Sequence, residues 1–404
     1  MDNVRRIPNR RGELRSPAKK PIQKPATPAV PKTKERLAKF DIPFFTITAV
    51  LLAFGVIMMY SASYAFAFRE HGDGNFFFRR QLLWIAIGLG AMIFMSFVDY
   101  RILLNKKIVS LIAIVSLGLM VAVRLMGTTQ GGAERWLSLF GITFQPSEIL
   151  KFAVIVVFAY FAHKRADVIT QFFKGFMPFA VFLGVACGLT VLQPHLSGTI
   201  IIFGIGLTMM IVSGCRFWHV LLMFAMVIVS AVVVLNIMEA QGYTYFDDRI
   251  LSWRDPEADV QNKTFQTYQS LVTIGSGGWF GSGLGNSIQK SGYLPATQND
   301  FIFSIVCEEL GFVGATLVIL LFLIFVFRGF YISSNARDRF GMMLGVGITV
   351  QIGIQALLNI AVATNSVPNT GILLPFFSYG GTALTMQLAQ IGILLNISRK
   401  AAIK

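Results

Sequence analysis

Residues 301–327 read FIFSIVCEELGFVGATLVILLFLIFVF and decide the class of fold. The run holds only two charged residues, Glu308 and Glu309, both in its first third. Because the hydrocarbon core of a bilayer requires about 20 helical residues, we interpret the run as a transmembrane helix. Nine other apolar runs predict, together with this one, ten spans: 43–67, 80–98, 107–126, 144–162, 175–192, 196–213, 217–237, 301–327, 340–363 and 372–397.

Composition agrees with a membrane protein and argues against a nucleic-acid-binding one. Of the 404 residues, 54% are hydrophobic and only 14% are charged, which is too apolar for one soluble domain. The net charge is +15, but residues 1–40 hold 12 of the 35 Lys and Arg and only 3 of the 20 Asp and Glu. A basic flank on an apolar chain is typical of contact with membrane lipid, so we expect no nucleic-acid partner. The 3 widely spaced cysteines indicate neither a disulfide framework nor a zinc site.

The distribution of charge predicts the topology. Residues 1–40 combine clustered Lys and Arg with several prolines, which predicts a disordered basic cytoplasmic tail. Lys and Arg recur in alternate connections, so both termini should be cytoplasmic. The largest connection, residues 238–300, has seven acidic against four basic residues and should lie outside. We therefore predict an all-α polytopic membrane protein of ten transmembrane helices, with its membrane domain at 41–404 and one large extracellular loop, 238–300, between helices 7 and 8.

The extracellular loop contains a dense run of glycines from Gly275 to Gly285. As a phosphate cradle the run is weak evidence, because it matches no nucleotide-binding spacing. Tight turns against the membrane surface are the favoured interpretation. Aromatic residues on both sides predict that the loop is partly ordered.

Ionisable residues in or beside spans mark candidate functional sites, because a charge in hydrocarbon is costly. They gather toward the predicted outer side. Glu148 and Lys151 open the fourth span, His195 precedes the sixth, and Glu308 and Glu309 lie in the outer half of the eighth. The membrane midplane lacks the charge relay of an ion-coupled pump. This placement predicts a polar cavity open to the outer leaflet, suited to a substrate with a lipid tail and a polar head.

Several polar residues allow two interpretations each. Asp300, directly before the eighth span, is either a helix N-cap or a general base. Arg135, beside a tryptophan in a short outer connection, is either an interfacial anchor or an anion binder. Gln351, Gln355 and Asn359 form a stripe on the ninth span that either bonds neighbouring helices or lines a cavity.

The chain resembles the SEDS family of bacterial cell-wall polymerases, which contains the FtsW, RodA and SpoVE proteins. The resemblance covers residues 43 to 399 and rests on several motifs in order. They are GAERW at 132–136, FQPSEILK at 144–151, Gln193-Pro194, Gln269-Ser270, IGSGG at 274–278, NDFIF at 299–303, EELG at 308–311 and PFFSYGG at 375–381.

The resemblance implies a peptidoglycan glycosyltransferase in the bacterial cytoplasmic membrane. Such an enzyme joins lipid II units, carried on undecaprenyl diphosphate, into glycan strands at the outer face. Asp300 matches the family's essential aspartate and would act as the general base. The other site residues implied are substrate-binding: Arg135, Trp136, Glu148, Lys151, Gln193, Gln269, Ser270, Gln289, Lys290, Glu308, Ser378 and Gly380. We expect no required cofactor and no protein metal site, although a divalent cation, Mg or Mn, would assist the leaving diphosphate.

The resemblance also implies partners: a class B penicillin-binding protein that acts as transpeptidase, and other divisome proteins. Gln289-Lys290 followed by Tyr293-Leu294-Pro295 looks more like the division branch or the related sporulation branch than RodA, which favours a place at the division septum. Three positions depart from the usual pattern. The stretch 295–300 reads PATQND, without the acid and histidine common there; His195 stands where an aspartate is usual; and Asn369 replaces a common lysine.

Two other functions stay open. A lipid II flippase would move the same substrate, but it should show ionisable or strongly polar residues through the depth of the membrane. A scaffold that only recruits a transpeptidase would not need Asp300. Within the polymerase interpretation, RodA-like elongation or spore-cortex synthesis are the alternatives to septal synthesis.

Overall fold

The computed structural model describes residues 40–130, 133–139, 142–193, 195–240, 245–291, 294 and 297–401. The predicted basic tail lies outside these residues, apart from its last position. Within them, eight helices are long and apolar enough to cross a membrane. They are α1 (Ile42–His71), α2 (Phe76–Phe97), α3 (Lys106–Met126), α4 (Pro146–Lys164), Phe172–Val191 including α5 (Met177–Val191), α6 (Leu196–Ser213), α10 (Ile302–Ser334) and α11 (Arg339–Ala363).

The two other predicted spans correspond to α7 (Phe217–Ala240) and α12 (Gly381–Lys400). The described apolar part of α7 is short, Phe217–Val229. The tenth prediction was wrong in its start, because residues 372–380 form an irregular loop and the helix begins at Gly381. Left-handed backbone at Gly371, with φ of +71°, and at Phe376, with φ of +68°, prevents an earlier helix start.

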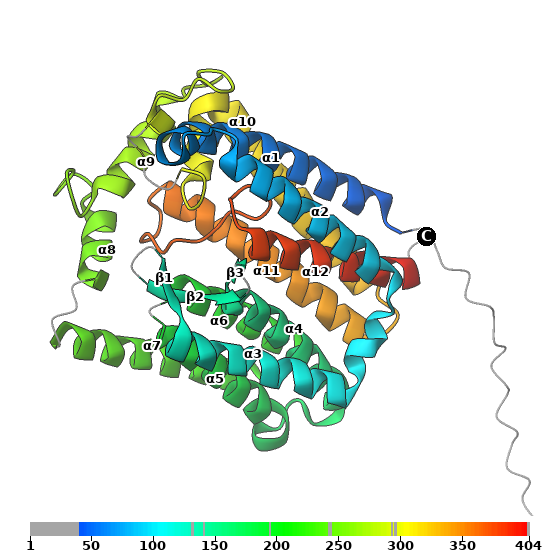
Figure 1. The fold of residues 1–404 in the computed structure, drawn as a ribbon. Helices are drawn as coiled ribbons and strands as arrows, with labels where there is room; N and C mark the ends of the chain where they lie inside the picture. The colour runs from blue at the N-terminus through cyan, green and yellow to red at the C-terminus, as the bar shows by residue number, and fades with distance from the viewer. Residues whose placement is uncertain are drawn as a thin grey trace, which may run out of the picture. The chain divides into compact units, whose positions relative to one another are not determined.

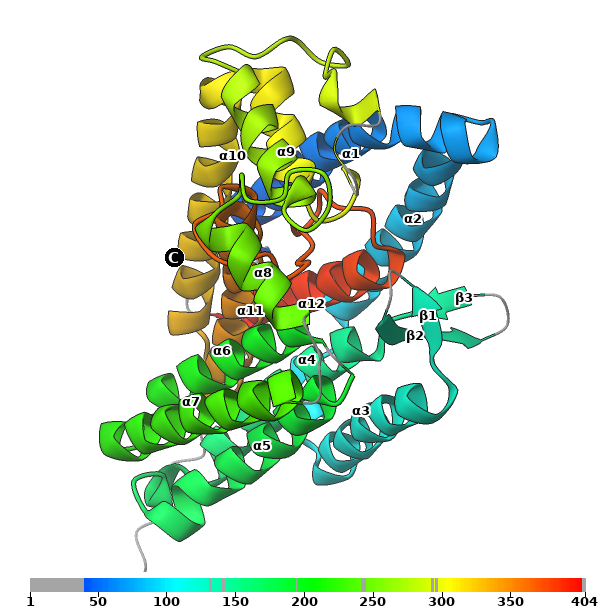
Figure 2. The same cartoon turned by 90° about the vertical axis from the view of Figure 1, so that its left-hand side faces the viewer.

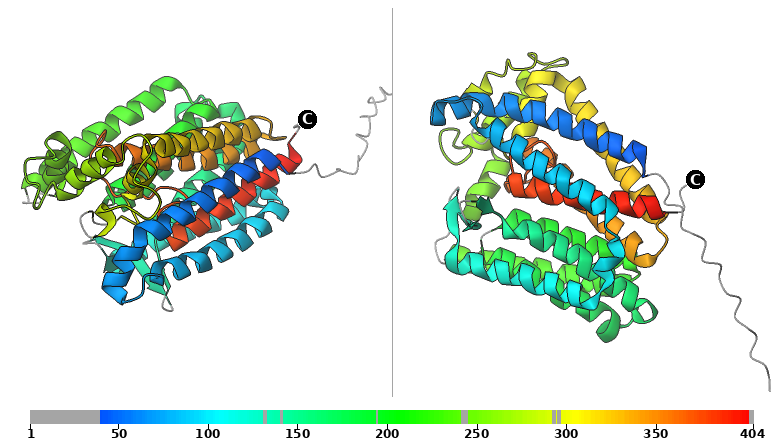
Figure 3. Two further views of the ribbon diagram at one scale, coloured as in Figure 1. Left: turned by 90° about the horizontal axis from the view of Figure 1, so that it is seen from above. Right: turned by 45° about the vertical axis from the view of Figure 1, so that its right-hand side comes forward.

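The helices run roughly side by side, with α12 in the interior between α2 and α11 (Figures 1 and 3). Small residues allow α2 and α12 to approach closely, as is common between membrane helices. A Cβ on Gly392 would stand 2.3 Å from the carbonyl oxygen of Met92, and one on Gly381 would stand 2.3 Å from the ring of Trp84. This contact places the start of α12, and the loop before it, next to the first half of α2.

A small antiparallel sheet corrects the all-α prediction. It consists of β1 (Thr128–Gln130), β2 (Ala133–Leu139) and β3 (Ile142–Phe144), in that spatial order, between α3 and α4 (Figure 2). Leu137 pairs with Phe144 across β2 and β3. Alternating apolar and polar residues in a short connection favour a hairpin over a helix. The fourth span consequently begins at Pro146, two residues later than predicted.

The large loop is ordered where it is described, as expected. It contains α8 (Tyr245–Arg254), α9 (Phe265–Ser276) and the 3₁₀ turn η4 (Gln289–Ser291), grouped at one end of the bundle (Figure 2). Short turns complete the chain: η1 (Tyr100–Leu104), η2 (Ala166–Val168) and the π-helical η3 (Phe172–Phe176).

The glycine run forms tight turns, as predicted, and packs across a break in α10. Gly311 has φ of +66° and ψ of −168°, which interrupts the helix. A Cβ on Gly281 would stand 2.2 Å from the carbonyl oxygen of Glu309, and the Phe312 amide donates to the Gly278 carbonyl at 2.9 Å. The run thus supplies hydrogen-bond partners for backbone groups that the broken helix cannot satisfy.

The opposite end of the bundle is rich in ion pairs. Asp41 caps α1 by accepting from the Phe44 amide at 2.9 Å, and it also binds Arg328 at 2.7 and 3.0 Å. Asp338 caps α11 and accepts from Tyr100 at 2.7 Å. These contacts tie together the start of α1, the end of α10, the start of α11 and η1.

Candidate functional site

Asp300 lies in a turn before α10 and is not its N-cap, so the capping interpretation was wrong. The N-cap position is Phe301, and no side chain caps the helix there. The Asp300 carboxylate is turned toward the loop between α11 and α12, where its Oδ2 is 3.3 Å from the position that a Cβ on Gly371 would occupy. The position of this carboxylate is therefore set by a turn and not by the end of a helix.

Two side chains hold the turn in place. Asn359 donates from Nδ2 to the Asp300 carbonyl at 2.8 Å and to the Ile372 carbonyl at 2.6 Å. Ser378 donates from Oγ to the Asn299 carbonyl at 2.6 Å. The backbone before Asp300 is therefore clamped to α11 and to the loop that precedes α12. Asn359 thus bonds a turn and a loop, and not a neighbouring helix.

The electrostatic setting of Asp300 favours a proton acceptor near neutrality. Loss of hydration raises the pKa of the Asp300 carboxyl to about 6, against the opposing positive fields of Arg249 and Arg135. Such a group is ionised at pH 7 and yet basic enough to take a proton. Arg135 acts on this carboxylate from β2, and both Arg135 and Trp136 are partly buried there.

A small polar cavity of about 40 Å³ lies beside Gly371, on the side of α4 and α6. Lys151 and Glu148 form an ion pair in its wall, with 2.7 Å between Nζ and Oε1, and their side chains are 2% and 6% exposed. The remaining polar side chains in the wall are Gln145, His195, Ser197 and Gln355. Gly371 thus lies between the Asp300 carboxylate and the cavity whose wall contains Lys151.

His195 is neutral in this cavity. Burial, together with the charges of Arg135 and Lys151, lowers the pKa of His195 to about 3. Its Nε2 is 3.0 Å from the Gln145 amide nitrogen and its Nδ1 is 3.3 Å from Ser197 Oγ. With Gln145 donating to Nε2, the ring proton sits on Nδ1 and is donated to Ser197. An uncharged imidazole thus stands where the resemblance leads us to expect an aspartate.

Several predicted substrate-binding residues contact other parts of the protein. Gln193 donates to the Met120 carbonyl at 2.7 Å. Ser270 donates to the Ala363 carbonyl at 2.8 Å and contacts Ser304. Ser378, besides its bond to the Asp300 turn, accepts from the Leu374 amide. Gln269 is partly buried on α9, and Gly380 precedes α12, with the position of a Cβ 2.9 Å from Leu373.

Glu308 and its neighbour hold the end of the large loop. Glu308 accepts from the Ser287 hydroxyl and from the amides of Ile288 at 3.0 Å and Gln289 at 3.4 Å. Lys290 binds the fully buried Glu309 at 2.7 Å, and Ser61 of α1 donates to the same carboxylate. The structure therefore places Gln289, Lys290 and Glu308 in a loop anchor, separate from the polar cavity.

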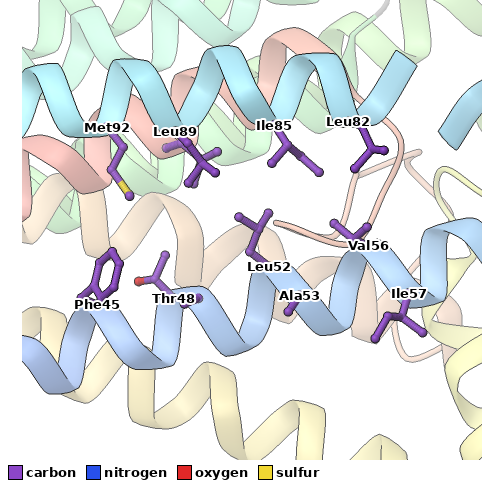
Figure 4. A pocket seen from close by; sticks show the side chains of 12 residues that line it. Phe45, Thr48, Leu52, Ala53, Val56, Ile57, Leu82, Ile85, Leu89 and Met92 are labelled. Carbon is purple, nitrogen blue, oxygen red and sulfur yellow. The ribbon is translucent and has the colours of Figure 1, made fainter. Parts of the chain in front are cut away.

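An apolar groove lies between α1 and α2, with a volume of about 530 Å³ (Figure 4). Figure 4 shows Leu52 and Val56 of α1 facing Ile85 and Leu89 of α2. The one polar side chain among the lining residues is Thr48, whose hydroxyl donates to the Phe44 carbonyl of its own helix. The groove therefore fits hydrocarbon, and it holds no group that could perform acid–base chemistry.

Within the described residues, no three His, Cys, Asp or Glu side chains come together to hold a metal ion. Sequence reasoning missed several contributors to the site, including Arg249 of α8, whose positive charge acts on Asp300. Gly371 was not singled out, although a glycine two residues after Asn369 signals a turn that needs positive φ. Gln145 stands within a quoted motif, but only the fold shows that it bonds His195.

Comparison with known proteins agrees with the fold and the motifs. The family model FTSW_RODA_SPOVE, described as "Cell cycle protein", matches residues 42–403. A Geobacter protein named "Probable peptidoglycan glycosyltransferase FtsW" is 36% identical over 90% of this chain and 98% of its own length. Stage V sporulation protein E of Bacillus subtilis is 39% identical over 89% of this chain and 97% of its own.

Solved structures give the same fold. A chain from a structure titled "Structural coordination of polymerization and crosslinking by a peptidoglycan synthase complex" has a TM-score of 0.72 at 25% identity, covering 89% of this chain and 98% of that one. The rod shape determining protein RodA of Thermus thermophilus has a TM-score of 0.65 at 23% identity, covering 90% and 98%.

Proposed function

The chain belongs to the FtsW/RodA/SpoVE family, and from this premise we propose that it is a peptidoglycan glycosyltransferase that polymerises lipid II, with Asp300 as its general base. It is a multi-pass membrane protein with eight apolar helices among its described residues. In the proposed topology α7 and α12 complete ten spans, both termini are cytoplasmic, and the loop of residues 238–300 lies outside. The ion-paired end of the bundle then faces the cytoplasm, on the side of the basic tail, and Asp300 faces the substrate.

In the proposed reaction one proton is transferred and one group leaves. Asp300 accepts the proton of the acceptor's 4-hydroxyl as that oxygen attacks the donor's anomeric carbon, and the bond to undecaprenyl diphosphate breaks. The configuration inverts from α to β. The observation that carries this role is the position of the carboxylate, partly buried against Gly371, with a pKa of about 6.

Positive charge near Asp300 would offset the charge on the leaving diphosphate. Lys151 is held in the cavity wall by Glu148, and the charge of Arg135 reaches both Asp300 and His195. A divalent cation, Mg or Mn, would add to this effect, with ligands from the diphosphate itself, since the described residues offer no cluster of their own. Trp136, Gln193, Gln269, Ser270, Gln289, Lys290, Glu308, Ser378 and Gly380 are proposed to shape or contact the substrate path.

The flippase alternative is less well supported. A flippase must move a diphosphate past the membrane midplane, which requires strongly polar groups at every depth. In the described spans the ionisable side chains stay near the two ends, and the buried glutamines of α11 and α12 carry no charge to compensate a diphosphate. The polymerase requires only the cavity at the end where Asp300 lies.

Similarity to the division and sporulation branches supports a role in septal synthesis with a class B penicillin-binding protein and other divisome proteins. The structural neighbour from a peptidoglycan synthase complex is consistent with such a partner. RodA-like elongation and spore-cortex synthesis are the competing assignments, which depletion of the protein during growth and sporulation would separate by cell shape.

The proposal is tested with purified protein in liposomes, supplied with lipid II and the partner transpeptidase. Two quantities are measured: glycan strand length on gels, and movement of fluorescent lipid II between leaflets. We expect strands from wild type, none from Asp300→Ala, and no leaflet exchange from either. Leaflet exchange without polymerisation would establish the flippase, and absence of both activities in the folded complex would leave the scaffold.

A further inference from the structure

Four glutamine side chains lie in two layers between α11 and α12, directly below the polar cavity. In the upper layer, Gln355 lines the cavity and accepts from Gln387 Nε2 at 3.3 Å. Gln351 precedes Gln355 by one turn on α11, and Gln390 follows Gln387 by about one turn on α12. Because the two helices are antiparallel, both steps lead away from Asp300, by roughly 5 Å.

The lower layer is buried and lacks protein partners. Gln351 is 0% exposed and Gln390 is 1% exposed. Among the described residues, neither the amide nitrogen nor the amide oxygen of either side chain has a hydrogen-bond partner. An amide left without hydrogen bonds in an apolar interior is strongly unfavourable, so neither side chain would persist in a dry core.

The cavity above the glutamines offers a source of water. Its volume of about 40 Å³ exceeds what one water molecule needs, and its wall presents polar groups of Gln145, Lys151 and Gln355. Away from the cavity the path closes, because Leu344 and Ile348 of α11 and Leu394 of α12 are fully buried. Leu394 reaches to 3.0 Å from the position of a Cβ on Gly345, so the helices touch there.

We propose that Gln351 and Gln390, below the Gln355–Gln387 pair, bind a cluster of ordered water molecules. The cluster extends the outer polar cavity toward the middle of the bundle and ends at the apolar layer of Leu344, Ile348 and Leu394. The interior is hydrated from the Asp300 end alone, so it forms a closed water pocket and not a channel. Gln355 both bonds α12 and lines the cavity, and for Gln351 the cavity-lining interpretation of the polar stripe then applies.

Thiol accessibility tests the water site directly. In a variant with Cys187, Cys215 and Cys307 replaced by alanine, one new cysteine is introduced at a time in the full chain, reconstituted in nanodiscs. Silver ion, which is close to water in size, is added, and thiols that escaped it are counted with a maleimide after denaturation. Gln351→Cys and Gln390→Cys are compared with Ile352→Cys and Ile391→Cys.

The two controls lie one residue away, at nearly the same depth, and are equally buried at 0% exposure. They also remove a side chain of similar volume, so any cavity created by the substitution is matched. We expect silver to react at least about tenfold faster at the glutamine positions than at the isoleucine positions, because only hydrated thiols are reached. Equal, slow reaction at all four positions would overturn the proposal.

A second measurement does not depend on cysteine. Gln351→Met and Gln390→Met replace each amide by an apolar side chain of similar length. If water satisfies the amides, the melting temperature stays the same or falls, since bound water is displaced without a polar gain. A clear rise in melting temperature in either variant would mean that the amide had been buried dry, which contradicts the water site.

Discussion

The carboxylate of Asp300 lies against Gly371, with Oδ2 only 3.3 Å from the place where a Cβ on that glycine would stand. Gly371 has φ of +71°, belongs to the loop before α12 and lines the polar cavity that contains Lys151. This glycine therefore lies between the proposed base and the cavity that contains the proposed charge-stabilising lysine.

Gly371→Ala should impair polymerisation more than it impairs folding. The methyl group would press on the Asp300 carboxylate, and the left-handed backbone would add strain of about 1–2 kcal/mol. Gly278→Ala is the matched control, because Gly278 also has positive φ, +53°, but no atom within 4 Å of the added Cβ. Both variants should lose similar thermal stability, and only Gly371→Ala should lose polymerisation rate, by about tenfold or more. Equal polymerisation rates in the two variants would show that Gly371 does not affect the reaction.

Asp300→Asn should stabilise the fold at alkaline pH. Because the pKa of Asp300 is raised to about 6, the folded protein holds this proton to higher pH than the unfolded chain does. Stability is therefore lost as pH rises from about 4 to 6, and above pH 6 the ionised carboxylate costs up to about 3 kcal/mol. The melting temperature of Asp300→Asn should exceed that of wild type at pH 8, and the gap should close toward pH 4.

An exposed carboxylate in the large loop provides the control for that comparison. Asp255→Asn alters a solvent-exposed side chain, so its melting temperature should follow wild type at both pH values. A difference between Asp300→Asn and wild type that does not change with pH would show that the carboxyl is not the group responsible.

Lys290→Met should destabilise the protein far more than Lys263→Met. Both lysines form ion pairs of 2.7 Å, but Glu309 is 0% exposed whereas the Lys263–Asp248 pair is 49% and 32% exposed. Removing Lys290 leaves a buried charge, which costs about 3–5 kcal/mol. Loss of the exposed pair costs less than about 1 kcal/mol. Thermal melting in detergent measures both, and similar losses would mean that water reaches Glu309.

Gly281→Ala should disrupt the packing of the glycine run across α10, and Gly285→Ala should not. The two glycines have nearly the same φ, +79° and +82°, so backbone strain is matched. A Cβ on Gly281 would stand 2.2 Å from the Glu309 carbonyl oxygen, whereas one on Gly285 has open space. We expect Gly281→Ala to lower the free energy of unfolding by several kcal/mol, because the added methyl group overpacks a tight contact. Limited proteolysis of the loop would detect the change, and equal resistance would contradict it.

The apolar spans could be predicted from the sequence because each is a local property of about 20 residues, as the run at 301–327 illustrates. Elements set by tertiary contact could not. The break at Gly311 and the start of α12 at Gly381 depend on backbone partners far along the chain. The cavity likewise required the fold, because Gln145, His195 and Gly371 lie on three different elements. Sequence reasoning placed Asp300 next to a helix start, but only the fold shows which way its carboxylate turns.

The role of Asp300 as general base is tested most directly by the pH dependence of kcat/KM for lipid II polymerisation, measured with wild type and Asp300→Asn between pH 5 and 8. Wild type should lose activity as the pH falls below about 6, by about tenfold for each further pH unit, because a protonated carboxyl cannot accept the hydroxyl proton. Asp300→Asn should be inactive throughout while remaining folded. A wild-type rate that stays level down to pH 5, or an Asp300→Asn variant as active as wild type, would contradict the account.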